Sequence, residues 1–173
     1  MNSCTYNLRK GAPYYQNLVN KIKSMLSMNH PIEVFEASTD NACATLYKKA
    51  FWESEKPIIT YNPNFISQLY RVSPWAVIAV FAHEVAHHYN GDLHGKFLAK
   101  NAGNLINYKS HRQELNADYI AGWVLSCEGA SLNQTTSLYH LIAMRDTYTH
   151  PATHKRINAA TEGWFAAKRA LAA

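Results

Sequence analysis

The spacing of hydrophobic residues changes early in the chain. From residue 12 to about residue 28, apolar side chains recur every three to four positions, which predicts an amphipathic helix that ends at Asn29-His30-Pro31. The composition then becomes typical of extended chain, with turn-forming or charged residues between the segments. These segments predict the three strands of a small sheet: 32–37, 42–48 and 57–61.

The rest of the chain is predicted to be mainly helical. A capping residue or a proline precedes each helical pattern, and these signals place helices at 62–71, 73–90, 110–128, 131–145 and after Pro151. The helix that begins at Ser73-Pro74 is apolar on almost every side over residues 77–81, so we expect it at the centre of the fold. In the last helix, the residues expected to be buried are Ile157, Ala160, Trp164 and Leu171. The pattern therefore predicts a single α+β domain, residues 1–173, mainly helical, with a small three-stranded sheet beside the central helix.

Composition and charge are those of an ordinary globular protein, with 47% hydrophobic and 17% charged residues. The longest apolar run, residues 75–82, is too short to cross a bilayer, and residues 1–10 lack the apolar core of a signal peptide. The sequence as given is therefore expected to be cytoplasmic, or exported if a leader has been removed. The net charge is +5, and the lysines and arginines include separated doublets without a stripe interleaved with aromatics, which favours a solvated surface over nucleic-acid binding.

The chain has three cysteines, Cys4, Cys43 and Cys127, and no Cys-x-x-Cys pair. This spacing argues against a disulfide framework and against a thiolate zinc site. We therefore expect buried or incidental thiols.

The stretch His83-Glu84-Val85-Ala86-His87 carries the most specific chemistry. On a helix, His83 and His87 lie one turn apart on the same face, so both imidazoles can bind one metal ion while Glu84 projects beside them toward a bound water. This arrangement is typical of zinc-dependent hydrolysis. Two surface histidines near a helix end are the alternative, and the apolar residues before them argue against it.

A catalytic zinc usually takes three protein ligands and a water, and two residues compete for the third position. His94 comes one residue later than the pattern H-E-x-x-H-x-x-G-x-x-H requires, within residues 91–109, which are either a loop over the cleft or a plain surface connection. Glu114 shares a helix face with Asp118, and the small Gly122 would allow close approach of another helix. We predict that Glu114 binds the metal and that Asp118 accepts a hydrogen bond from a ligand histidine. A solvated acidic pair near a helix N-terminus is the alternative.

Together these elements resemble the HtpX-like and CAAX-prenyl-protease-like zinc peptidases of the gluzincin group, in particular the small members without membrane helices. The resemblance spans about residues 40–165 and rests on His83-Glu84-Val85-Ala86-His87, Glu114-x-x-Ala117-Asp118, Thr149-His150-Pro151 and Arg156-Ile157. It implies a minimal zincin-type domain that holds one zinc ion and takes a protein or peptide substrate.

The resemblance also implies roles for residues outside the metal ligands. His150 would lie close to the zinc, where it assists the transition state or occupies the open coordination position in a latent form. From the residues alone, an ordinary loop histidine before the helix-starting Pro151 stays possible. Asn41-Ala42 resembles the element that, in gluzincins, lies on the edge strand and binds substrate backbone, although Cys43 replaces the family's phenylalanine. His88 and His111 match no family position and are expected to be solvated.

The expected function is that of a zinc-dependent endopeptidase with Glu84 as general base and His150 assisting. Two other functions stay open. One is a regulatory metallopeptidase dedicated to a single repressor-like target. The other is a non-catalytic or latent zinc-binding domain that binds proteins without cutting them, with His150 closing the fourth coordination position.

Overall fold

The computed structural model describes residues 3–5, 7–48, 50–93, 103–141 and 150–172, with only the backbone described for residues 3 and 103–110. The described residues form an α+β fold that is mainly helical, as predicted. In chain order the elements are η1 (Ser3–Thr5), β1 (Arg9–Lys10), α1 (Pro13–Met25), β2 (Glu33–Glu36), β3 (Ala42–Tyr47), β4 (Lys56–Tyr61), α2 (Pro63–Val72), α3 (Pro74–Tyr89), α4 (Gly103–Cys127), α5 (Leu132–Leu141) and α6 (Thr153–Leu171).

The sheet has four strands in the order β1-β2-β4-β3, so β3 is an edge strand. Strand β2 pairs in parallel with β4, while β3 and β4 form an antiparallel pair in which Ala44 lies opposite Ile59. The sequence predicts only three of these strands. The fourth, β1, has two residues and pairs with the end of β2, which is too short a segment to show a periodic pattern.

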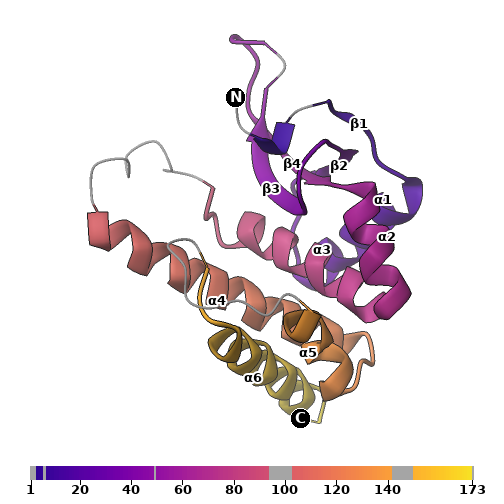
Figure 1. Ribbon diagram of the computed structural model, residues 1–173, viewed down its shortest axis with the longest axis vertical. Coiled ribbons are helices and arrows are strands. Elements are labelled where there is room, and N and C mark those ends of the chain that lie inside the picture. Colours follow the sequence, from indigo (N-terminus) through magenta and orange to yellow (C-terminus); the bar gives the residue numbers. More distant parts are fainter. Residues whose placement is uncertain (1–2, 6, 49, 94–102, 142–149, 173) are drawn as a thin grey trace.

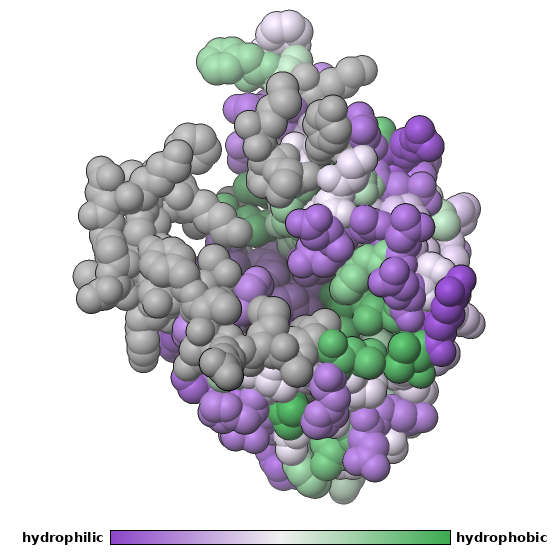
Figure 2. All heavy atoms as spheres, viewed as in Figure 1, coloured by the Kyte–Doolittle hydropathy of each residue, from purple (hydrophilic) through white to green (hydrophobic). Residues whose placement is uncertain are grey.

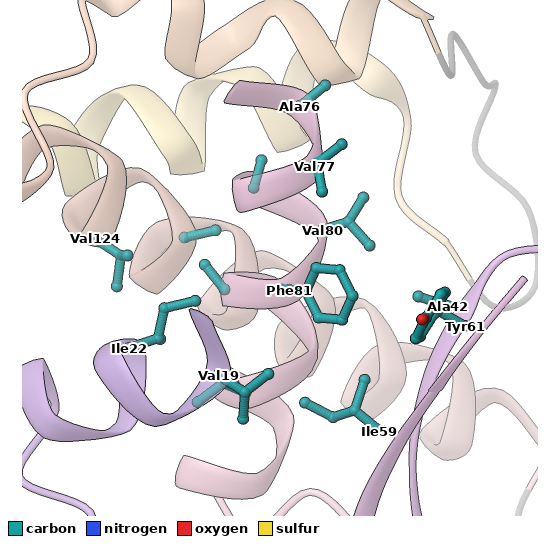
Figure 3. Close-up of a cluster of buried hydrophobic side chains, with 14 of the residues drawn as sticks. Val19, Ile22, Ala42, Ile59, Tyr61, Ala76, Val77, Val80, Phe81 and Val124 are labelled. Carbon is teal, nitrogen blue, oxygen red and sulfur yellow. The ribbon is translucent and has the colours of Figure 1, made fainter. Parts of the chain in front are cut away.

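Helix α3 runs through the centre of the molecule, as its apolar pattern predicts. In Figure 1 it lies between the sheet with α1 and α2 on one side and α4, α5 and α6 on the other. Phe81 and Val80 point toward the sheet (Figure 3). The helix face with Ala79 and Ala82 is also fully buried. Because most of its residues are buried, α3 is a rigid support for the side chains of its last turns. No helix among the described residues is both long enough and apolar enough to span a membrane.

Helices α4 and α6 pack at unusually short range. A Cβ added to Gly122 would overlap the backbone of Ala160, and one added to Gly163 would overlap the carbonyl oxygen of Tyr119. The small residues on α4 therefore do allow the close helix approach that the sequence suggests. This contact brings Arg156 of α6 beside Asp118 of α4.

Several local predictions are wrong. Helix α4 begins at Gly103, so Ser110 lies within the helix and does not cap it. Ser73 makes no side-chain cap hydrogen bond. His88 is buried, with Nε2 2.9 Å from the carbonyl oxygen of Ile58, so it is not solvated. Leu171 is largely exposed, because it lies in the last turn of α6, where no further element covers it among the described residues. His111, predicted to be solvated, is partly buried. Ile157 and Trp164, predicted to be buried, are only partly buried.

The cysteine prediction is also wrong. Cys4 and Cys43 form a disulfide with their Cα atoms 6.0 Å apart, which ties η1 to strand β3. Cys127 is a free thiol. The pairing depends on contact between residues 39 positions apart, which cysteine spacing alone does not reveal. Such a bond persists in an oxidising compartment and is reduced in the cytoplasm.

Candidate metal centre

The last turns of α3 present two imidazoles to the same point. His83 and His87 lie one turn apart, and their Nε2 atoms are 3.1 Å from each other. Their rings are nearly perpendicular, with centroids 4.7 Å apart. Both side chains are mostly buried. Because residues four apart lie on the same face of a helix, the two histidines present their nitrogen donors to one point.

Helix α4 brings a carboxylate to the same point. Glu114 Oε2 lies 3.4 Å from His83 Nε2, and Glu114 Oε1 lies 3.4 Å from His87 Nε2. One ligand atom from each of the three residues lies within 4.8 Å of the others, so the group could hold a metal ion. The structure thus brings together the three residues predicted as ligands. His94, the competing candidate, lies outside the described residues.

The distances between nitrogen and oxygen atoms in this group are close to those between the ligands of a small tetrahedral cation. With metal–ligand bonds of about 2.0–2.1 Å, neighbouring donors on a tetrahedron are about 3.3–3.4 Å apart. The Nε2 atoms of His83 and His87 lie 3.1 Å apart, and each lies 3.4 Å from a different oxygen of Glu114. A set of two imidazoles and one carboxylate is also characteristic of catalytic zinc.

Asp118 orients the first histidine. Its Oδ1 lies 2.9 Å from His83 Nδ1, so the Nδ1 proton points to Asp118 and Nε2 is left as the metal donor. Asp118 has no exposed surface and also accepts hydrogen bonds from Tyr139 Oη at 3.0 Å and from Arg156 Nε and Nη2 at 2.7 and 2.8 Å. Tyr139 and Arg156 are therefore part of the support of the site, although the sequence gives a role to neither.

Asp92 orients the second histidine in the same way and is absent from the sequence prediction. Its Oδ2 lies 2.9 Å from His87 Nδ1. The end of α3 explains this contact, because Gly91 takes a positive φ of 69° and Asp92 N–H donates to the carbonyl of His87 at 3.1 Å. This is the Schellman ending, which folds the second residue beyond the helix back over its last turn. The Asn90-Gly91 stop signal could have revealed Asp92.

The charged groups of the site determine one another's ionisation. Burial opposes the charged form of His83, but the carboxylates of Asp118 and Glu114 outweigh it and raise the pKa of His83 to about 10. Burial also opposes ionisation of Glu114, whereas its contacts with His150, His83 and His87 hold its pKa well below the usual range. A metal ion that binds here must therefore displace a proton from His83.

Glu84 lies at the junction between α3 and the sheet. Its Oε2 accepts a hydrogen bond of 2.6 Å from the backbone N–H of Ala44 on the edge strand β3. The surface is hollowed between the sheet and helices α4 and α6, and the inside of the hollow is hydrophilic (Figure 2). Ala44 is a further residue that the sequence does not single out, because the contact depends on how the sheet packs against α3.

The predicted substrate-binding residues lie at the start of the same strand. Asn41 is exposed, and its carbonyl accepts a hydrogen bond of 2.8 Å from Asn62 N–H, on the β4 side. Ala42 is buried, and its side chain belongs to the core near Tyr61 (Figure 3). The side chain of Ala42 is thus not available at the surface, in contrast to the role that the resemblance implies for it.

His150 lies beside the metal-binding group, just before α6. Its Nδ1 is 3.1 Å from Glu114 Oε2, and 38% of its side chain is exposed. It is not among the three residues whose ligand atoms converge. Thr149, which precedes it in the predicted element, lies outside the described residues.

Comparisons of the chain with protein-family models, with curated protein sequences and with solved structures find no significant match.

Proposed function

We propose that this protein is a zinc-dependent endopeptidase. The observation that carries the proposal is the convergence of His83, His87 and Glu114, with the carboxylate of Glu84 one residue from the first of them. A group of three protein ligands leaves one coordination position for water or substrate, which is the arrangement of catalytic zinc and not of structural zinc. The resemblance of the motifs to the HtpX-like and CAAX-prenyl-protease-like peptidases supports the same function.

In this proposal a bound zinc ion supplies Lewis acidity, which polarises the scissile carbonyl and acidifies a water molecule. The chain's own residues move the protons. Glu84 accepts the proton of the attacking water and later delivers it to the leaving amine. The hydrogen bond from Ala44 N–H engages Oε2 of Glu84 and holds the carboxylate in place, so we assign Oε1 to proton transfer. His150, at the mouth of the site, is placed to stabilise negative charge that develops on the substrate.

The edge strand is the surface that we assign to the substrate backbone. Because Asn41 bonds toward β4 and residues alternate along an antiparallel pair, the backbone groups of Ala42, Ala44 and Leu46 point away from β4. The contact of Ala44 N–H with Glu84 agrees with this direction. An extended peptide can add to such an edge through main-chain hydrogen bonds, which gives affinity without strong side-chain preference.

The test pairs zinc analysis with a cleavage assay on an unfolded protein such as casein. Glu84→Gln is compared with wild type and with Glu162→Gln, which removes an exposed carboxylate from α6 outside the site. We expect about one zinc ion per chain in all three proteins. Loss of a general base costs about 10²- to 10⁴-fold in turnover, so Glu84→Gln should be nearly inactive and Glu162→Gln normal. Normal turnover by Glu84→Gln would remove Glu84 from its role.

The rival functions give different results in the same assay. A regulatory metallopeptidase with one dedicated target would bind zinc and leave casein intact. A non-catalytic zinc-binding domain would cleave no substrate, and His150→Ala would lower its zinc affinity, because His150 would then be the fourth ligand. Casein cleavage that depends on zinc and on Glu84 excludes both.

A further inference from the structure

The loop between β3 and β4 exposes two adjacent aromatic side chains. Phe51 is 89% exposed and Trp52 is 85% exposed, which makes them the most exposed large hydrophobic residues that the structure describes. In Figure 1 this loop projects from the sheet at one end of the longest axis of the molecule. Figure 2 shows apolar surface at the same projecting end. We call residues 50–55 the hairpin tip.

The aromatic side chains of the hairpin tip contribute nothing to the core. Residues 51–56 are all exposed, and neither aromatic ring belongs to the buried hydrophobic cluster. Burying such rings on folding would contribute substantially to stability, so their exposure indicates a partner that covers them.

The size of the tip argues against a folded protein as that partner. A stable protein interface buries about 800 Å² on each side, drawn from about 20–30 residues. Two aromatic rings supply about 300–500 Å² at most. Moreover, a projecting tip is convex, so it offers no pocket for a partner's side chains. A fluid apolar phase needs no complementary shape and can accept both rings.

The charges around the tip suit the surface of a phospholipid bilayer. Three lysines (Lys48, Lys49 and Lys56) and two glutamates (Glu53 and Glu55) flank or belong to it. The ammonium group of Lys48 lies 5.7 Å from the centroid of the Phe51 ring, so a cation sits at the base of the apolar tip. Tryptophan is enriched at membrane–water interfaces, where its ring lies at the level of the headgroups beside basic side chains. Because the charge of the tip is nearly balanced, the aromatic rings and not the lysines would supply most of the affinity for the bilayer.

We propose that the hairpin tip is a membrane-contact element that inserts Phe51 and Trp52 into the interfacial region of a phospholipid bilayer. The rest of the molecule then stands on the membrane at one end of its long axis. Strand β3 leads from the tip to Ala44 beside Glu84, and three residues of strand, from Ala44 to Tyr47, span about 10 Å. The inference does not depend on peptidase activity, because membrane contact is measured without catalysis.

The test is flotation of the full chain with vesicles of phosphatidylcholine alone and of phosphatidylcholine with added phosphatidylglycerol. Wild type is compared with Phe51→Ser/Trp52→Ser and with Val72→Ser/Leu171→Ser, which removes exposed apolar side chains elsewhere. We expect the tip variant to lose about tenfold or more in partitioning on both vesicles, and the control variant to match wild type. Phosphatidylglycerol should raise binding only modestly, because the tip has nearly balanced charge.

A second readout locates the contact. The fluorescence of wild type should shift to shorter wavelength on vesicles, and this shift should vanish in Trp52→Phe, which keeps an aromatic ring and most of the binding. Failure of wild type to bind either vesicle overturns the proposal, as does equal binding by wild type and the tip variant. If the tip variant floats like wild type but binds unfolded polypeptide less well, the tip contacts protein chains and the membrane proposal is wrong. All variants change exposed side chains, and equal unfolding midpoints verify that they are folded.

Discussion

Asp118→Asn tests the structural basis of the candidate metal centre. The substitution keeps the size of the side chain and removes its charge. Asp118 faces His83 on one side and Arg156 on the other, and all three groups are buried. The change should therefore affect two measurable properties, the metal affinity and the free energy of unfolding, through two different neighbours.

The expected magnitude for folding comes from Arg156. Arg156 is 7% exposed, and its guanidinium makes two hydrogen bonds of 2.7 and 2.8 Å to Asp118. Removing one partner of a buried ion pair costs about 3–5 kcal/mol, because the other charge is left buried without compensation. The asparagine keeps one acceptor, so we expect a loss near the lower end, about 3 kcal/mol. The measurement is urea unfolding in the presence of a chelator.

The expected magnitude for metal binding comes from His83. Residues that orient a ligand histidine usually contribute about 10- to 100-fold to metal affinity. Competition with a chromophoric chelator should show this loss for Asp118→Asn at neutral pH. The matched variant is Asp92→Asn, because Asp92 orients His87 at the same distance of 2.9 Å and has no hydrogen bond from Arg156 among the described contacts. It should lower zinc affinity by a similar factor and unfolding free energy by only about 1 kcal/mol.

Two results would refute this reasoning. If Asp118→Asn unfolds within about 1 kcal/mol of wild type, the Asp118–Arg156 pair is not the buried support described above. If both Asp variants bind zinc as tightly as wild type, the two carboxylates do not orient the histidines, and the metal assignment loses its second line of support.

Three further predictions concern packing, the disulfide and pH. Gly163→Ala should lower the unfolding free energy by about 3 kcal/mol or more, since the new Cβ overlaps the Tyr119 carbonyl; a urea midpoint equal to that of wild type would contradict the close helix contact. Cys4→Ser should cost about 4 kcal/mol, the chain-entropy value for a closed loop of this length, and wild type treated with a dithiol reductant should unfold at the same midpoint as the variant. Because the pKa of His83 is about 10 without metal and that of His87 is also raised, protons compete with zinc in the neutral range, so zinc affinity should rise about tenfold or more per pH unit between about pH 7 and pH 9; titration by competition at several pH values would show a flat profile if neither histidine is a ligand.

The parts of the site that helical geometry predicts directly are the pairs of residues that a single helix brings together. His83 and His87 are separated by four residues, and so are Glu114 and Asp118, so each pair follows from helical geometry alone. Asp92 lies within the same local range, because the Asn90-Gly91 ending determines its position. Ala44 lies outside this local range, because its contact with Glu84 depends on the packing of an edge strand against α3.

The predictions of the start of α4, of the strand pairing and of the cysteine pairing failed for a related reason. A capping signal such as Ser110 contributes only about 1 kcal/mol, which the helical backbone from Gly103 onward overrides. The fourth strand and the disulfide at Cys4 both involve the N-terminal segment, whose few residues have no periodic pattern. The N-terminal segment pairs with β2 and bonds to Cys43 of β3, and these contacts exist only once the sheet has assembled.

The support of the metal centre shows why the ligands were easier to predict than the groups that hold them. Glu114 and Asp118 are placed by α4, but the charge of Asp118 is balanced by Arg156, which comes from α6. That pairing requires the two helix backbones to approach closely, and the approach requires glycine at positions 122 and 163, where any side chain would overlap the opposite helix. The ligand residues are thus recognisable from local motifs on α3 and α4, whereas the stability of the site depends on the contact between α4 and α6. A substitution at Gly163 should accordingly weaken metal binding without changing any residue near the metal.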